Sequence, residues 1–416
     1  MSFKSTLIWI FLFATGFTYA QVEEVNPPDN IKSITFKSNT SDLGELPIIQ
    51  LGETFYLEFD ALTSDEPDFY YKIEHYDYNW EPSVLVKPEF LLGIDNFRIQ
   101  DYNNSFNTFQ MYSHYSLTIP NQQTKRLKVS GNYIISIYDS YGDLVFSRKF
   151  MIYEDIVTPG IAIKRSRDVS TIETTQTVDI EIAAGTQINN PKQTIKTLII
   201  QNSNLNTAIS NLKPQYTIGN TLIYRYTKET AFPAGNEYLF LETKDVRAAS
   251  SRVQSIALED IYQSYLYTDI ARHDLPYTYN PDINGQFKIV AIDRDDVSIE
   301  ADYVQVHFSL KHSELLNGEH IYIYGNYNNY ALNDFNKMTY NDQYGVYQAS
   351  MILKQGFYNY KYVVVNKDNT LNEGAISGNF WQTENNYKVL VFYRDLGARY
   401  DRIIGFNQVT STNISN

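Results

Sequence analysis

The chain has 416 residues, enough for two or three domains of ordinary size, and it contains no cysteine. No disulfide braces the fold, which must therefore rest on its apolar cores. The formal net charge of −14 argues against nucleic acid and anionic lipid surfaces as partners, because both would repel an acidic chain. The 36 Tyr and 23 Phe favour β-sheets with some aromatic surface left for contacts.

Residues 1–20 have the pattern of a secretory signal peptide. Lys4 precedes an apolar run from Leu7 to Phe17, and Ala20 ends the segment before a polar stretch. The run is too short to span a membrane, and no later segment approaches ~18 uninterrupted apolar residues. We therefore expect an exported protein with no direct membrane insertion.

Short alternating segments predict β-strands in the first third of the chain. Phe55, Leu57 and Phe59 alternate with more polar residues, which is typical of a half-buried strand. Similar patterns predict strands at residues 69–76, 112–119, 132–139 and 144–153. The connection over residues 79–109 is long but rich in aromatic residues, so we expect it to be ordered. The turn at residues 158–160 ends a first β-sandwich domain, residues 21–157.

The remaining chain also favours strands over helices. Candidate strands and Pro- or Asn-rich turns predict a second β-sandwich domain over residues 158–297. Alternation at residues 303–310, a hairpin signal at residues 317–318 and a last strand at 387–393 predict a third domain, residues 298–416, with a polar tail. The predicted fold is all-β, with tandem immunoglobulin-like or E-set β-sandwich domains.

No residue pattern indicates chemistry. The six His residues are scattered, and no nucleophile motif, zinc-binding His pair or Gly-rich phosphate loop is present. We expect no catalytic residue, no metal site and no cofactor, and hence no enzyme.

One stretch resembles a glycan-binding module. Tyr322 to Val365 is similar to the β-sandwich modules appended to starch- and glycogen-active enzymes. In that family the position of Tyr330 is an aromatic residue that stacks on a sugar, which makes Tyr330 a glycan-stacking candidate. Residues 366–374 hold no second aromatic residue where that family has one. An exported glycan-binding protein is therefore kept as the alternative function.

A longer stretch, residues 70–139, resembles the N-terminal domain of the type IX secretion system plug family. The matching pieces, in order, are residues 71–73 (YKI), 77–83 (DYNWEPS), 89–93 (EFLLG), 105–108 (SFNT), 112–115 (YSHY), 117–121 (LTIPN) and 130–133 (SGNY). The resemblance implies a non-enzymatic periplasmic protein at the inner face of the outer membrane. It also implies a partner, the giant translocon barrel, whose periplasmic opening such proteins close when no substrate is in transit.

Aromatic residues of the 79–112 connection are the candidates for contact with that partner, because Tyr and Trp are enriched at binding hot spots. The candidates are Trp80, Phe97, Tyr102, Phe106, Phe109 and Tyr112. The alternative is that most of these rings fill the core of the first domain.

Overall fold

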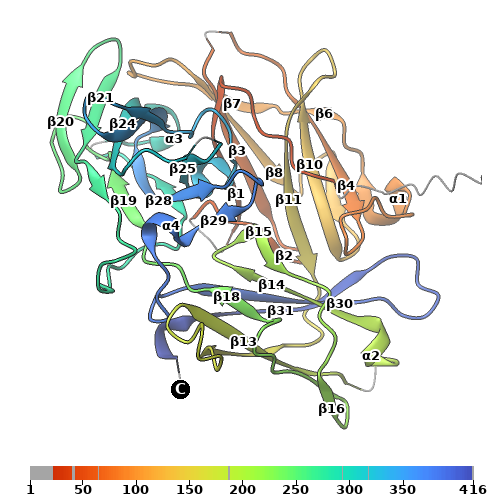
Figure 1. Ribbon diagram of the computed structural model, residues 1–416. Helices are drawn as coiled ribbons and strands as arrows, with labels where there is room; N and C mark the ends of the chain where they lie inside the picture. Colours follow the sequence, from red (N-terminus) through yellow and green to blue (C-terminus); the bar gives the residue numbers. More distant parts are fainter. Residues whose placement is uncertain are drawn as a thin grey trace, which may run out of the picture.

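The computed structural model describes residues 22–39, 43–63, 65–185, 188–292, 294–316 and 318–414. The predicted signal peptide lies outside these residues. The chain folds into strands packed as layered sheets, which confirms the all-β prediction. Three sandwiches are present, and the N-terminal and third sandwiches lie side by side above the middle one (Figure 1).

The N-terminal sandwich packs a four-stranded sheet on a five-stranded sheet. The first sheet has the order β1 (Ile31–Ser38), β3 (Phe55–Ala61), β8 (Ser113–Ile119) and β7 (Asp101–Asn104). The second has the order β2 (Ile48–Gln50), β11 (Leu144–Tyr153), β10 (Gly131–Tyr138), β4 (Tyr70–Tyr76) and β6 (Phe97–Arg98). Phe55, Leu57 and Phe59 face the core between the sheets, as the alternation predicts.

The long connection after β4 is ordered and carries structure of its own. It contains α1 (Lys87–Phe90), then β5 (Leu91–Gly93), which pairs with β9 (Thr124–Leu127) as a two-stranded ribbon. It continues through β6 and β7 and enters β8 by a loop over residues 105–112.

The middle sandwich is built from two distant parts of the chain. One sheet has the order β12 (Gly160–Arg165), β13 (Thr175–Ala183), β17 (Thr221–Tyr224) and β16 (Tyr216–Ile218), with β18 (Ala231–Pro233) also on β13. The other has the order β15 (Asn204–Ile209), β14 (Ile195–Gln201), β30 (Asn386–Tyr393) and β31 (Arg402–Thr410). The short α2 (Pro191–Thr194) leads into β14, and the 3-10 turn η2 (Ser411–Asn413) follows β31.

The third sandwich takes the segment between those two parts. Its larger sheet has the order β20 (Val253–Leu258), β21 (Tyr262–Leu266), β24 (Tyr303–Lys311), β27 (Val346–Lys354) and β26 (Thr339–Asn341), with β22 (Asp269–Ile270) on β24. The facing sheet centres on β28 (Gly356–Val365), which pairs with β19 (Leu239–Glu242), β23 (Phe287–Ile289), β25 (His320–Tyr324) and β29 (Leu371–Asn372). The short elements are α3 (Val297–Glu300), η1 (Asn326–Asn328) and α4 (Gly374–Ser377).

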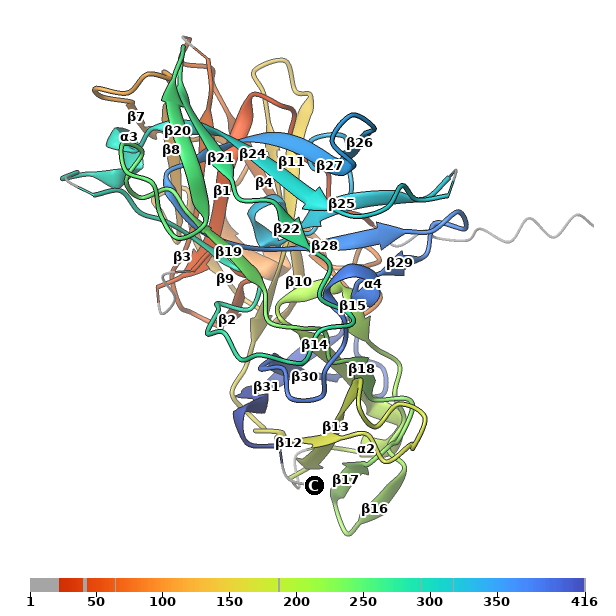
Figure 2. The ribbon, with the colours of Figure 1, turned by 60° about the vertical axis from the view of Figure 1, so that its left-hand side comes forward.

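Strand pairing corrects the predicted division at residues 297 and 298. β21 lies before that point but pairs with β24 after it, in register from Tyr262 with Val304. β30 lies in the predicted third domain but pairs with β14 of the middle sandwich, with Leu198 opposite Leu390. The chain therefore leaves the middle sandwich, completes the third and returns, as the green and dark blue strands at the bottom of Figures 1 and 2 show.

Candidate interaction surface

The loop over residues 105–112 is closed by its own ends. The backbone N–H of Ser105 donates to the carbonyl of Tyr112 at 2.8 Å, and the N–H of Tyr112 donates to Ser105 Oγ at 3.0 Å. Asn107 adopts a left-handed conformation with φ of 56°, which Asn tolerates better than most residues. The sequence between the ends therefore forms a compact turn with its base fixed.

The backbone of this loop is attached to the third sandwich beside α3. The N–H of Phe106 donates to the carbonyl of Ile299 at 2.9 Å, and the N–H of Phe109 donates to Asp302 Oδ1 at 2.8 Å. The hydroxyl of Tyr112 donates to the carbonyl of Ala301 at 2.9 Å. These three contacts set the position of the loop relative to both sandwiches.

The tip of the loop presents three apolar side chains to solvent. Phe106, Phe109 and Met111 expose 66%, 52% and 61% of their surface. The ring of Phe109 meets that of Tyr262 on β21 edge to face, with centroids 5.3 Å apart. Single exposed apolar side chains are ordinary, but three within six residues on a fixed loop are typical of a contact surface.

The structure divides the six aromatic candidates by exposure. Phe106 and Phe109 are exposed at the loop tip. Phe97 and Tyr102 are half-buried and pack against the edge of the N-terminal core. The Tyr102 ring stacks on Tyr115 with centroids 5.4 Å apart, and its hydroxyl donates to Glu66 Oε2 at 2.9 Å.

The prediction that Trp80 and Tyr112 contact a partner is wrong, because each side chain is buried, at most 4% exposed. Trp80 belongs to an apolar cluster between the N-terminal and middle sandwiches. The Tyr112 ring lies edge to face with Tyr303 of the third sandwich at 5.3 Å. Both rings lie where separate sandwiches meet. Amino-acid composition does not distinguish aromatic rings at such internal contacts from rings at an interface with another protein.

Met111 is the residue that the sequence reasoning missed. Met111 has no aromatic ring, but Met is also enriched at interfaces and adapts its shape to a partner. The signal in the sequence is an apolar side chain two residues after Phe109 and one residue before Tyr112.

A buried charged cluster underlies the loop and joins the N-terminal and third sandwiches. Lys354 Nζ on β27 lies 2.7 Å from Asp60 Oδ2 on β3, and the Tyr303 hydroxyl donates to the same oxygen at 2.6 Å. His114 Nδ1 lies 2.7 Å from Asp60 Oδ1. Burial, the largest influence, acts to raise the pKa of Asp60, but Lys354 and His114 together hold that pKa below its usual value of 3.8. Asp60 is therefore an ionised, fully hydrogen-bonded carboxylate.

The prediction that Tyr330 stacks on a sugar is also wrong, because its side chain is buried. Its hydroxyl donates to the carbonyl of Asn202 at 2.9 Å, across the contact between the third and middle sandwiches. Its ring lies 5.1 Å from that of Tyr324, which accepts a hydrogen bond from Asn204 at 2.9 Å. This residue positions two sandwiches rather than a ligand.

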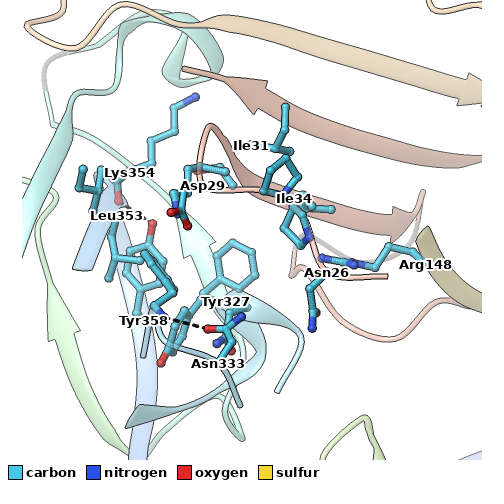
Figure 3. Close-up of a pocket in the computed structure, with 18 residues that line it drawn as sticks. Asn26, Asp29, Ile31, Ile34, Arg148, Tyr327, Asn333, Leu353, Lys354 and Tyr358 are labelled. Atoms are coloured by element: carbon cyan, nitrogen blue, oxygen red, sulfur yellow. Dashed lines mark hydrogen bonds between the residues drawn. The ribbon is translucent and has the colours of Figure 1, made fainter. Parts of the chain in front are cut away.

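The crevice between β1 and the third sandwich is too small for a substrate. Figure 3 shows Ile31 and Ile34 on one side and Tyr327 and Tyr358 on the other. Its cavity of about 60 Å³ has room for a few water molecules at most. A wider cleft of about 770 Å³, where all three sandwiches meet, is mainly polar and lacks the apolar lining of ordinary ligand pockets.

The described residues contain two serine–histidine pairs, His75 with Ser83 and His307 with Ser350, but both environments are structural. The second ring nitrogen of His307 lies 2.8 Å from Gln263 Oε1, so no carboxylate orients that ring. His75 Nδ1 lies 2.8 Å from Ser83 Oγ, and Nε2 lies 3.2 Å from the carbonyl of Ser130. Burial lowers the pKa of His75 to about 4, so the ring is neutral at pH 7. Among the described residues, no group of three or more His, Asp or Glu side chains is placed to hold a metal ion. None of the helices in that same part of the chain is long and apolar enough to span a membrane.

Comparison with protein families identifies the N-terminal sandwich. Residues 31–154 match the model described as "Type 9 secretion system plug protein 1st domain", a range that begins with β1 and ends one residue after β11. The chain belongs to the type IX secretion plug family. This membership gives it a role in type IX secretion, in a family of non-catalytic components that associate with an outer-membrane barrel.

Solved structures extend the likeness beyond that first domain. The crystal structure of a hypothetical protein from Parabacteroides merdae matches with a TM-score of 0.89 and 32% identity, over 94% of this chain and 100% of that one. Salmonella alpha-2-macroglobulin matches 94% of this chain and 24% of that one at 11% identity, but the TM-score of 0.14 does not indicate a shared fold. A comparison with curated proteins finds no match. This chain and the Parabacteroides protein therefore share the arrangement of all three sandwiches.

Proposed function

We propose that this protein is a non-enzymatic periplasmic plug that binds the periplasmic opening of the type IX translocon barrel and seals it when no substrate is in transit. Membership of the plug family supports this proposal most strongly. The predicted signal peptide over residues 1–20 fits export to the periplasm, and the plug would then lie at the inner face of the outer membrane.

A plug needs a rigid body, and the contacts between sandwiches supply one. The widest outer-membrane barrels have up to about 36 strands, so their lumen would leak unless it were blocked. Here the N-terminal sandwich is attached to the third through Asp60 and Lys354, and to the middle one through the apolar cluster that includes Trp80. Such a body acts by shape and binding, so its mechanism requires no reacting group.

The loop over residues 105–112 is the proposed contact with the barrel. Its exposed side chains supply apolar area, and its fixed backbone reduces the entropy lost on binding. A stable seal requires about 1,000 Å² of buried surface in total, so the loop forms one part of a larger interface.

Co-purification with the barrel from cells tests this proposal. Replacement of Phe106, Phe109 and Met111 together by Ala should reduce recovery of the barrel on the order of tenfold or more, since buried apolar anchors dominate interface energies. The matched control is the double replacement Tyr141→Ala and Tyr344→Ala, which removes exposed rings elsewhere and should leave recovery unchanged. Equal recovery with both variants would show that this loop is not the contact.

The glycan-binding alternative has no support in the described structure. Its single stacking candidate, Tyr330, is buried between two sandwiches.

A further inference from the structure

A second surface of the N-terminal sandwich combines exposed aliphatic side chains with exposed basic side chains. Val84, Val86, Leu92 and Ile94 lie within eleven residues around α1 and β5, and each exposes between 45% and 61% of its surface. The neighbouring strand β9 and the residue after it carry exposed cations. We call this surface the basic–aliphatic face, and its residues are Val84, Val86, Leu92, Ile94, Lys125, Arg126 and Lys128.

Pairing of β5 with β9 places the two kinds of side chain together. Leu91 lies opposite Leu127, and both are buried against the N-terminal core. Leu92 lies opposite Arg126, and both point away from that core because side chains alternate along a strand. The N–H of Ile94 donates to the carbonyl of Gln123 at 3.0 Å, which continues the ribbon. Aliphatic and basic groups therefore share one outward side.

Two carboxylates beside this surface, those of Asp95 and Glu89, are paired with other cations. Asp95 lies 2.6 Å from Lys87 Nζ, and Glu89 lies 2.5 Å from the Arg399 guanidinium. Within the described residues, no carboxylate is at ion-pair distance from Lys125, Arg126 or Lys128. The face is thus positive on a chain whose formal net charge is −14.

The face is preformed by contacts behind it. Arg399, from the β30–β31 connection, donates to the carbonyl of Val84 at 3.0 Å. Lys87 Nζ donates to the carbonyl of Ile73 on β4 at 2.6 Å, and Lys128 Nζ donates to that of Pro88 at 2.8 Å. Binding through this surface would therefore require little ordering of the chain.

We propose that the basic–aliphatic face docks on the surface of a bilayer that contains anionic phospholipid. Aliphatic side chains beside Lys and Arg are the combination that binds such surfaces, through apolar burial at the head-group boundary and attraction to the anionic leaflet. A protein-binding hot spot would instead centre on a Trp or Tyr ring, and the four exposed apolar residues here include no aromatic ring. This is peripheral docking, distinct from insertion of a spanning segment.

The face and the loop at residues 105–112 lie on different sides of the molecule. In Figure 1, α1 is at the right, whereas α3, which anchors the loop, is at the upper left. One surface can therefore contact a lipid head-group layer while the other contacts a protein. The inference goes beyond the proposed plug function and does not depend on it.

Local charge explains why the chain's overall acidity does not forbid this contact. At an ionic strength of 0.1 M, charges more than about 10 Å apart are largely screened from each other. Head groups at the face therefore respond mainly to Lys125, Arg126 and Lys128 rather than to distant carboxylates. Net charge alone predicts that anionic lipids repel the protein. The local charge of this face predicts attraction instead.

Co-sedimentation of the full mature chain with vesicles tests the proposal. Binding should be measurable with vesicles of phosphatidylcholine mixed with phosphatidylglycerol, and much weaker with phosphatidylcholine alone. It should fall steeply in 1 M salt, where the Debye length is about 3 Å. The double variant Lys125→Glu, Arg126→Glu should bind the mixed vesicles at least tenfold more weakly, and Leu92→Ser, Ile94→Ser should also weaken binding.

The matched control is Lys192→Glu, Lys228→Glu, which changes the net charge equally on the middle sandwich at exposed positions. It should retain wild-type binding. The proposal is overturned if both charge-reversed variants lose binding equally, or if the wild type ignores the mixed vesicles. It is also overturned if variants of the face lose an acidic protein partner while vesicle binding is absent. Vesicle binding is measured without the barrel, so its result can contradict this proposal without contradicting the proposed plug function.

Discussion

The joints that attach the N-terminal sandwich to its two neighbours have centres of different chemistry. Towards the third sandwich, the joint is a buried ionic cluster around Asp60 and Lys354. Towards the middle sandwich, the centre of the joint is an apolar cluster that includes Trp80, Leu198 and Phe392. Ion pairs, such as Asp77 with Arg394 and Glu154 with Arg402, lie around that cluster. The first joint depends on the geometry and charge of a few groups, whereas the second depends mainly on buried area.

The difference follows from which side of each strand meets the neighbour. In β3, Phe59 points into the N-terminal core and Asp60 points the other way, into the third sandwich. At the other joint, the Tyr78 ring meets the Phe392 ring at 4.8 Å, and its hydroxyl donates to the carbonyl of Thr197 at 2.8 Å. One joint should therefore fail on loss of a charge, and the other on loss of volume.

The largest expected effect is at the ionic joint. Lys354→Met leaves Asp60 buried without its cationic partner, so the free energy of unfolding should fall by about 3–5 kcal/mol. Denaturant unfolding at pH 7 measures this change. The double variant Asp60→Asn, Lys354→Met removes both charges and should recover part of the loss. A double variant less stable than Lys354→Met alone would contradict the assignment of the cost to an unpaired carboxylate.

The next largest effect is the pH dependence of stability that His75, beside the apolar joint, should cause. His75 contacts the carbonyl of Ser130 and the ring of Tyr400, and burial lowers its pKa to about 4 from 6.5. Between these values the unfolded chain binds a proton that the folded chain does not, so stability is complete above pH 6.5 and falls towards pH 4. The loss is on the order of 3 kcal/mol.

Unfolding free energies measured from pH 7 to pH 4 test this slope, with His75→Gln as the comparison. The variant should lack the part of the slope that His75 contributes. Asp60 acts in a lower window: its pKa is held below 3.8, so its contribution persists above that value and is lost as the pH falls further. An unchanged slope in His75→Gln would show that the ring does not carry the effect.

The smallest expected effect is a loss of volume at the apolar joint. Leu198→Ala should cost about 2–3 kcal/mol, the lower part of the range for buried Leu, because Leu198 keeps slight exposure. The cost should be independent of salt and of pH between 5 and 8, since no charge changes. A cost that varied strongly with salt would contradict the apolar description.

Much of the fold could be predicted because it is local. The alternation of Phe55, Leu57 and Phe59 predicts both a strand and its buried side, and the observed strand has that pattern. The pairing of Leu198 with Leu390 could not be predicted in this way, because nothing in either segment refers to a partner nearly two hundred residues away. The predicted boundary at residue 297 was wrong for that reason.

The candidate surface could be predicted only in part. Phe106 and Trp80 belong to the same aromatic connection, but one is exposed and the other fills a joint between sandwiches. Residue type does not separate these outcomes, because an aromatic ring is suited to both. Family resemblance identified the domain, while exposure in the folded chain was needed to choose among its rings.

Permeability of the outer membrane in cells that lack this protein tests the central proposal most directly. If the protein seals the translocon barrel, deletion of its gene should make cells sensitive to antibiotics too large for ordinary porins, and the wild-type gene should restore resistance. The Phe106→Ala, Phe109→Ala, Met111→Ala variant should restore less resistance than wild type, while Tyr141→Ala, Tyr344→Ala should restore it fully. A deletion strain whose outer membrane excludes these antibiotics as well as the parent, while the barrel is present, would contradict the proposed plug function.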